Sequence, residues 1–524
     1  MKMPTNKIYA VLMAAATIGF SACEKKLDLV NPNAPTSASF WNTGTDAIKG
    51  INAAYASLLI DGSYMRSTPL MMDTRGDDAK SNSPWLQMYN TGKFALNTAD
   101  GAIYAWSYGA WYEGISKANQ VLNYVPAIEM DAALKDRIMG QAYFLRGLYF
   151  FHLANFWGNV AYPTSLPASK DEFYMEQESA EQGWDKVIAD FQQAANLLPV
   201  SYDAVGGPDQ GQKGRATKGA ALAYLGKAHM FHTTKKDYTA AAAAFKAVID
   251  LGVYDLMPNY RDNFTEVAEN NKESIFEVQF DLSAGGTELG WGGTPSSGWG
   301  KTSARAITYG PRGFGFVDVQ PTRSVFNSFL EEKTAGGDDD PRLVATMFYN
   351  KPGLKLYGQE FSVFYGGNPA DLNDLFCRKY ENDETKPNEF DWRSGINERL
   401  MRYADVLLMY AECLNENGST AQAYPYIQRV RSRVGLPDLA VTKPGMTQAQ
   451  MRDQIAQERL LEFCLEGKRF DDIRRWGWLQ DPAKLALLKS RDPEFNSYQA
   501  GREYFPIPQS EIDINRGWKQ NLSY

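Results

Sequence analysis

The chain has 524 residues, 44% of them hydrophobic, which is enough for one large domain or for two or three ordinary ones. Its formal net charge of −8 argues against nucleic-acid binding, which depends on the neutralisation of phosphates by lysine and arginine. Apart from Cys23, the cysteines are odd in number and widely spaced, which is not the pattern of a disulfide framework.

The first 22 residues have the pattern of an export signal. Two lysines precede an apolar run, residues 8–20, which is shorter than the roughly 20 residues that span a bilayer. Ser21 and Ala22 stand directly before Cys23, which resembles the lipobox of bacterial lipoproteins, although Phe20 replaces the usual leucine. In such proteins the cysteine is acylated and becomes the first mature residue. We expect a signal peptide over residues 1–22 and lipidation of Cys23, with an ordinary signal peptide as the alternative.

The rest of the chain is predicted to be a polar, proline-containing tether, residues 23–40, followed by a mainly α-helical body, residues 41–524. Apolar residues recur with the helical period in segments 45–59, 138–156, 181–198, 217–231, 238–251, 399–416, 422–434 and 448–466. Two pairs of these segments have small residues at the spacing of tetratricopeptide hairpins, with simple helical hairpins as the alternative. We expect a helical-repeat scaffold over residues 41–251 and 399–480.

Between residues 252 and 398 the helical pattern fades and glycine and proline become frequent. Residues 275–280 alternate like a β-strand. The glycine-rich segment 285–315 holds several aromatic residues, whereas disordered tracts are poor in them. The sequence therefore predicts a loop-rich, partly irregular half with a structured, exposed surface.

Two loops carry the residue types that bind sugars, whose rings need flat aromatic surfaces and a few placed polar groups. One is the polar loop 75–90, and the other is the glycine-rich segment. Arg378 is a secondary candidate, because its guanidinium can form hydrogen bonds to hydroxyl groups or to a carboxylate. The predicted ligand-binding residues are Trp85, Asp77, Asp78, Asn82, Trp291, Trp299, Tyr309 and Arg378. For each tryptophan, the alternative is that it anchors its loop to the core.

Residues 458–475 are dense in charge and could be mistaken for a catalytic cluster. Glu458, Glu462 and Glu466 lie one helical turn apart and share a face, with arginines close in sequence. We interpret them as a structural ion-pair network. We expect no catalytic residue, no metal site and no cofactor.

Several stretches, in this order, resemble the SusD family of nutrient-binding outer-membrane lipoproteins. They are "LDLVNPN" after Cys23, then "GQAYFLRGLYFFHLANFWGNVAYPT", "ATKGAALAYLGKAHM", "NKESIFEVQF", "DDDPRL", "LMRYADVLLMYAECLNENG", "IAQERLLEFCLEGKRFDDIRRWG" and "YFPIPQSEIDINRGWKQN". The resemblance implies a helical body with four tetratricopeptide units and a less regular, ligand-facing part.

The same resemblance implies a function. The protein would be anchored in the outer membrane, exposed at the cell surface, and would bind an oligosaccharide. As a lid, it would deliver this ligand to a SusC-like TonB-dependent barrel. Some members take a peptide instead, so peptide capture is one alternative. A surface glycoside hydrolase is another, because two carboxylates about 5 to 10 Å apart cannot be recognised from sequence. A repeat scaffold without a small ligand is the third.

Overall fold

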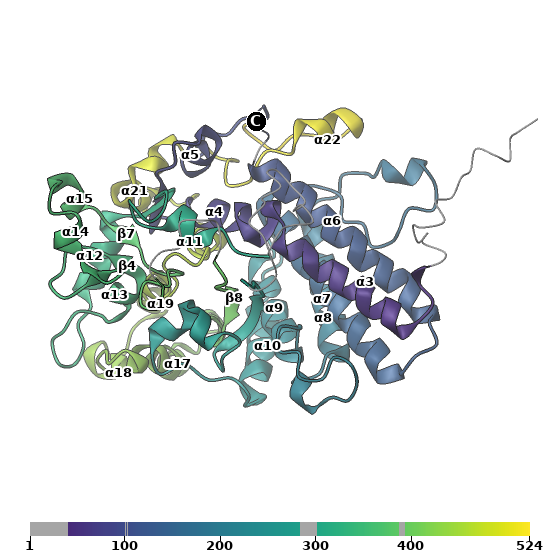
Figure 1. Cartoon of the computed structure of the whole chain (residues 1–524), viewed down its shortest axis with the longest axis horizontal. Coiled ribbons are helices and arrows are strands. Elements are labelled where there is room, and N and C mark those ends of the chain that lie inside the picture. The colour runs from purple at the N-terminus through teal and green to yellow at the C-terminus, as the bar shows by residue number, and fades with distance from the viewer. Residues whose placement is uncertain (1–39, 100, 102, 283–300, 387–393) are drawn as a thin grey trace, which may run out of the picture.

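The computed structural model describes residues 40–99, 101, 103–282, 301–386 and 394–524 (Figure 1). The predicted signal peptide, the predicted lipidation site Cys23 and the predicted tether up to residue 39 lie outside these residues, as do Trp291 and Trp299. None of the described helices has both the length and the apolar character that a membrane crossing requires. The fold is mainly helical, which confirms the predicted fold class.

The first half of the chain forms a set of long helices that pack on one another in sequence order (Figure 1). They are α3 (Gly44–Ala56), α6 (Ile103–Tyr124), α7 (Ala132–Phe156), α8 (Ala180–Leu197), α9 (Lys218–Phe231) and α10 (Tyr238–Asp250). Capping boxes at Thr43 and Ser179 satisfy the first backbone N–H groups of α3 and α8. Helices α6 and α7 approach so closely that a Cβ at Gly114 would lie 2.4 Å from the ring of Tyr149.

The last part of the chain forms a second helical set, coloured green to yellow in Figure 1. Its members are α16 (Tyr403–Glu416), α17 (Thr420–Arg433), α19 (Gln448–Glu462), α20 (Arg469–Arg475) and α21 (Pro482–Arg491). Helix α10 packs against α16 and joins the two sets. The pairs α9–α10 and α16–α17 are the two helical hairpins that the sequence predicts.

One predicted helical boundary is wrong. Residues 399–402, expected to begin a helix, belong to strand β8 (Glu398–Arg402), which pairs antiparallel with β2 (Ser274–Val278). Strand β2 itself confirms the strand predicted from residue 275. In this ladder the buried Arg399 forms an ion pair with Glu277 in β2, and the buried Arg402 forms one with Glu273, directly before β2. The strand pairing brings these side chains together.

In sequence, the loop-rich half lies between the two helical sets. Its described residues confirm the predicted loss of long helices in this part of the chain. Its described part holds short helices, among them α11 (Arg305–Tyr309), α12 (Arg323–Glu331), α13 (Arg342–Thr346), α14 (Phe361–Phe364) and α15 (Pro369–Asn373). Two-stranded ladders connect them: β4 (Met347–Phe348) pairs with β7 (Phe376–Cys377), and β5 (Lys355–Leu356) with β6 (Gln359–Glu360). A third ladder, β1 (Ala79–Ser81) with β3 (Val319–Pro321), ties this half to the early loop 75–90.

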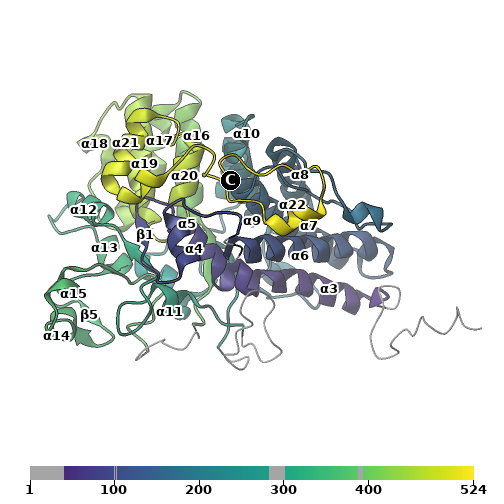
Figure 2. The ribbon, with the colours of Figure 1, turned by 90° about the horizontal axis from the view of Figure 1, so that it is seen from above.

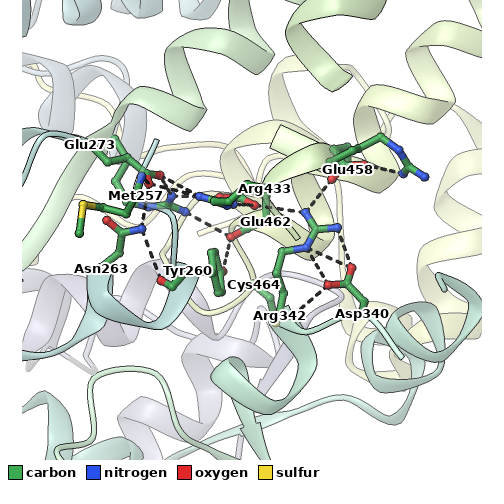
Figure 3. A network of polar contacts seen from close by, with 12 residues as sticks. Met257, Tyr260, Asn263, Glu273, Asp340, Arg342, Arg433, Glu458, Glu462 and Cys464 are labelled. Carbon is green, nitrogen blue, oxygen red and sulfur yellow. Dashed lines mark hydrogen bonds and ion pairs between the residues drawn. The ribbon is translucent and has the colours of Figure 1, made fainter. Parts of the chain in front are cut away.

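A buried network of ion pairs fastens the loop-rich half to α17 and α19 (Figure 3). Glu462 lies at its centre and accepts from Arg342 at 3.1 Å, Arg402 at 3.0 Å and Arg433 at 2.5 Å. Burial alone would raise the pKa of Glu462, but the three guanidinium groups lower it to about 2. Buried charges are tolerated only when they are paired in this way. Residues 458–475 thus take part in ion pairs, but the partners of Glu462 come from distant segments and not, as was predicted, from the arginines close in sequence.

Candidate functional site

Four of the predicted ligand-binding residues are buried and have protein partners. Asp77 forms ion pairs with Arg469 and Arg491, the first residue of α20 and the last residue of α21. Asp78 is 1% exposed and accepts from the backbone N–H of Leu465 at 3.2 Å. Burial, together with the neighbouring carboxylates, raises the pKa of Asp78 to about 8. The prediction that Asp77 and Asp78 face a ligand is therefore corrected, because arginines and backbone groups from distant segments enclose them.

The same correction applies in the loop-rich half. Tyr309 is 1% exposed, and its hydroxyl donates to Asp73 at 2.8 Å. Arg378 is 9% exposed and forms ion pairs with Asp383 and Glu384, each at 2.9 Å. Tyr309 therefore links the loop-rich half to the early part of the chain, and Arg378 pairs within that half. Neither side chain is exposed to solvent, in contrast to the prediction.

Trp85 and Asn82 remain at the surface. Asn82 is exposed and its side-chain amide donates to the carbonyl of Val317 at 3.2 Å. Trp85 is half-buried and immediately precedes α5 (Leu86–Gly92). Its ring lies 5.7 Å from that of Trp106, in the first turns of α6, and the two planes are tilted by 38°. We call these two indoles, with the 60% exposed Leu86, the Trp85–Trp106 patch.

A buried arginine supports the patch from one side. The guanidinium carbon of Arg66 lies 5.4 Å from the ring centroid of Trp85 and 5.8 Å from that of Trp106. Arg66 donates two hydrogen bonds to Asp61, at 2.7 and 2.5 Å, and both side chains are 3% exposed. Asp61 belongs to the irregular helical turn η2 (Asp61–Met65) between α3 and α4 (Ser67–Asp73). The positive charge that holds the indoles is thus locally neutralised.

A second aromatic group lies on the loop that Asn82 contacts. Phe314 stacks on Tyr357 with ring centroids 4.5 Å apart, and its ring lies 5.0 Å from that of Phe364. In the same loop, Val317 has a φ of +55°, a conformation that costs a β-branched residue energy. The hydrogen bond from Asn82 to the carbonyl of Val317 joins the loop 75–90, which contains Trp85, to the loop at residues 310–318.

Sequence reasoning singled out Trp85 but missed Trp106 and Arg66. Trp106 lies inside a helix, where an aromatic residue at helical spacing usually indicates core. Arg66 carries no local signal, because its role depends on the fold of η2. The second aromatic group could have been suspected from Phe314, which lies between two glycines in "RGFGF".

The described residues include no cluster of three His, Cys, Asp or Glu side chains arranged to hold a metal ion. Chemically, the patch offers two apolar ring systems beside an exposed amide and a neutralised ion pair. Such a surface can bind the apolar face of a sugar ring while polar groups meet its hydroxyls.

A helical-repeat body that carries an aromatic patch beside a loop-rich half defines a class of binding protein. Two family models match this chain: the SusD family over residues 272–524, and the family described as "Starch-binding associating with outer membrane" over residues 32–230. The chain belongs to the SusD/RagB-like family.

Individual relatives match over nearly the whole length. SusD-like protein P25 from Formosa agariphila is 26% identical over 507 residues, which cover 91% of each chain. A laminarin-binding SusD-like protein of known structure is 26% identical, with a TM-score of 0.74 over 92% of this chain and 100% of that chain. A SusD superfamily protein from Bacteroides vulgatus has a TM-score of 0.78 at 24% identity, over 93% of this chain and 100% of that chain.

Proposed function

We propose that this protein binds a neutral oligosaccharide or polysaccharide at the Trp85–Trp106 patch. The observation that carries the proposal is the pair of indoles held by Arg66, whose charge Asp61 neutralises. Sugar rings stack on aromatic faces, and a patch whose supporting arginine is already paired with Asp61 favours uncharged glycans over uronate polymers. A relative of similar fold is described as laminarin-binding, which supports the same ligand class.

The wider role follows from the family. We propose that Cys23 is acylated, that the acyl chains hold the protein in the outer membrane, and that a SusC-like TonB-dependent barrel receives the ligand. The family description "associating with outer membrane" supports this location. Detergent extracts from the native host should contain a TonB-dependent barrel that co-purifies with the protein. Extracts that contain none under several growth conditions would contradict the lid role.

The binding test uses laminarin and soluble starch as probes on native affinity gels, beside a neutral-glycan array. The Trp85→Ala/Trp106→Ala variant should lose most of the retardation and most of the neutral-glycan array signal that the parent protein shows. Phe173→Ala is a matched control, because Phe173 is an aromatic side chain that is 66% exposed and lies outside the patch. Equal glycan binding by the double variant and the control would exclude the patch. Binding of peptides instead of glycans, with the same dependence on the two tryptophans, would favour the peptide alternative.

A further inference from the structure

A pocket of about 480 Å³ opens where α10, α16, α19, α20 and α21 meet. These helices lie together in the upper part of Figure 2. We call it the five-helix pocket. It shares no lining residue with the Trp85–Trp106 patch, whose residues come from the start of α5 and from α6. Its volume is within the range of about 300 to 1,000 Å³ that small-molecule sites occupy.

Aromatic side chains form part of the pocket wall and are fixed in place. The indole N–H of Trp476 donates to Glu412 at 2.9 Å, and the guanidinium of Arg475 lies 4.8 Å from its ring centroid. The ring of Trp478 lies 5.4 Å from that of Trp476, and Tyr238 at the start of α10 adds a third ring to the lining. Trp476 and Tyr238 both line the pocket and are half-buried, so each side chain keeps some accessible surface.

The charges in the wall are balanced in number, and six of the eight charged side chains form ion pairs with one another. Lys236 instead donates to the backbone carbonyl of Arg475, and Asp481 accepts from the backbone N–H groups of Ala483 and Lys484. The lining includes the acids Glu412, Glu416, Asp453 and Asp481 and the bases Lys236, Arg452, Arg475 and Lys484. Arg452 donates two hydrogen bonds of 2.6 Å to Glu416. Lys484 donates to Asp453 at 2.7 Å, and Arg475 to Glu412 at 2.7 Å.

This balance selects the ligand. An ionic ligand that bound one of the six ion-paired side chains would have to displace its partner and leave that partner's charge uncompensated. A hydroxyl group can donate to a carboxylate and accept from a guanidinium or ammonium group without breaking the pair's neutrality. The rim is accessible for such contacts, because the side chains of Arg452 and Asp453 are 52% and 66% exposed. Aromatic surface beside paired donors and acceptors is the chemistry that recognises an uncharged sugar.

We propose that the five-helix pocket is a second binding site for a neutral saccharide, separate from the Trp85–Trp106 patch. The inference goes beyond the proposed function, because the pocket needs neither the patch nor the barrel. Two sites on one body raise the apparent affinity for a polymer that is long enough to reach both, since the second contact becomes intramolecular.

The test blocks the pocket without disturbing the core. Ala449 lines the pocket and is exposed on α19, so Ala449→Trp should fill the pocket and leave the fold intact. The matched control is Val441→Trp, which places the same bulk on the nearby α18 (Leu439–Thr442), at a residue that is 74% exposed and does not line the pocket. Asp453→Ala, at the exposed rim, is the second pocket variant.

All variants are made both in the parent protein and in the Trp85→Ala/Trp106→Ala background, and probed on an array of neutral and uronate glycans. In that background we expect residual neutral-glycan binding that Ala449→Trp lowers at least tenfold, that Asp453→Ala lowers several-fold, and that Val441→Trp leaves unchanged. Uronate signals should not respond to Ala449→Trp.

Three results would overturn the inference: no array signal that responds to Ala449→Trp in either background, equal loss with Val441→Trp, or a response confined to uronates. The two proposals fail separately. If only the two tryptophan substitutions lower neutral-glycan binding, the pocket is excluded as a site and the patch is supported. If only Ala449→Trp lowers it, the patch is excluded and the pocket is supported.

Discussion

Arg433 and Glu462 form a 2.5 Å ion pair with side chains that are only 3% and 0% exposed. Each is the last residue of its helix, α17 and α19 respectively. An arginine is favoured at a helix C-terminus, whereas a carboxylate there is disfavoured by the helix dipole. Glu462 therefore depends on several arginines, and its position is set by charges that come from three separate parts of the chain.

Glu462→Gln should strongly destabilise the protein. The change leaves Arg342, Arg402 and Arg433 with less negative charge in the interior, and breaking a buried pair costs about 3–5 kcal/mol. Urea unfolding measures the difference. Asp453→Asn, which breaks the exposed pair with Lys484, is the control and should cost at most about 1 kcal/mol. A Glu462→Gln protein as stable as this control would show that the network contributes little.

Asp78→Asn should flatten the dependence of stability on pH. The pKa of Asp78 rises from 3.8 to about 8 on folding, so the folded protein holds a proton that the unfolded chain releases. This group's contribution is fully present below about pH 4 and is lost as the pH rises to about 8. Asparagine can still accept from the N–H of Leu465, so the fold should persist. The free energy of unfolding of the parent protein and of Asp78→Asn, measured from pH 4 to 9, tests this prediction. Parallel curves for the two proteins would contradict the raised pKa of Asp78.

Trp85→Ala alone should weaken glycan binding by roughly two- to tenfold. An aromatic contact is worth about 0.5–1.5 kcal/mol beyond its buried area, and about 1.4 kcal/mol corresponds to a factor of ten. Because Trp85 also packs against the core, titration calorimetry must be compared at equal folded fraction, judged from thermal melts. Phe173→Ala should bind like the parent. If Trp85→Ala lowers the melting temperature but not the affinity, the residue is a loop anchor.

Cys23→Ala should release the protein from the membrane. The acyl chains on Cys23 are the proposed anchor, and each buried methylene contributes roughly 0.8 kcal/mol to membrane binding. Palmitate labelling and fractionation of cells that lack the partner barrel would measure the effect. A variant that stays with the membrane in those cells would remove the main support for the lipoprotein assignment.

Helix positions could be predicted from sequence because helical periodicity is local. The strand at residues 398–402 could not, since it runs directly into α16 and its identity depends on pairing with residues 274–278. Asp77 shows the same limit for the site: it lies in a polar loop, but its partner Arg469 follows 392 positions later. Trp85 was identified because a tryptophan among serine and proline is hard to bury. Trp106 was not, because its surroundings resemble a core helix.

The buried ion pairs also constrain when the chain can finish folding. Arg342 pairs with Glu458 and Glu462, and Arg402 pairs with Glu462 and Glu466, carboxylates that follow their arginine partners by 60 residues or more. Until that last segment is available, Arg342 has the neighbouring Asp340 and Arg402 has Glu273, but the other carboxylates of the buried network are missing. A polypeptide led through a membrane by its N-terminus would therefore stay loosely folded until most of its length had crossed. This delay suits an exported protein, because translocation requires an unfolded chain.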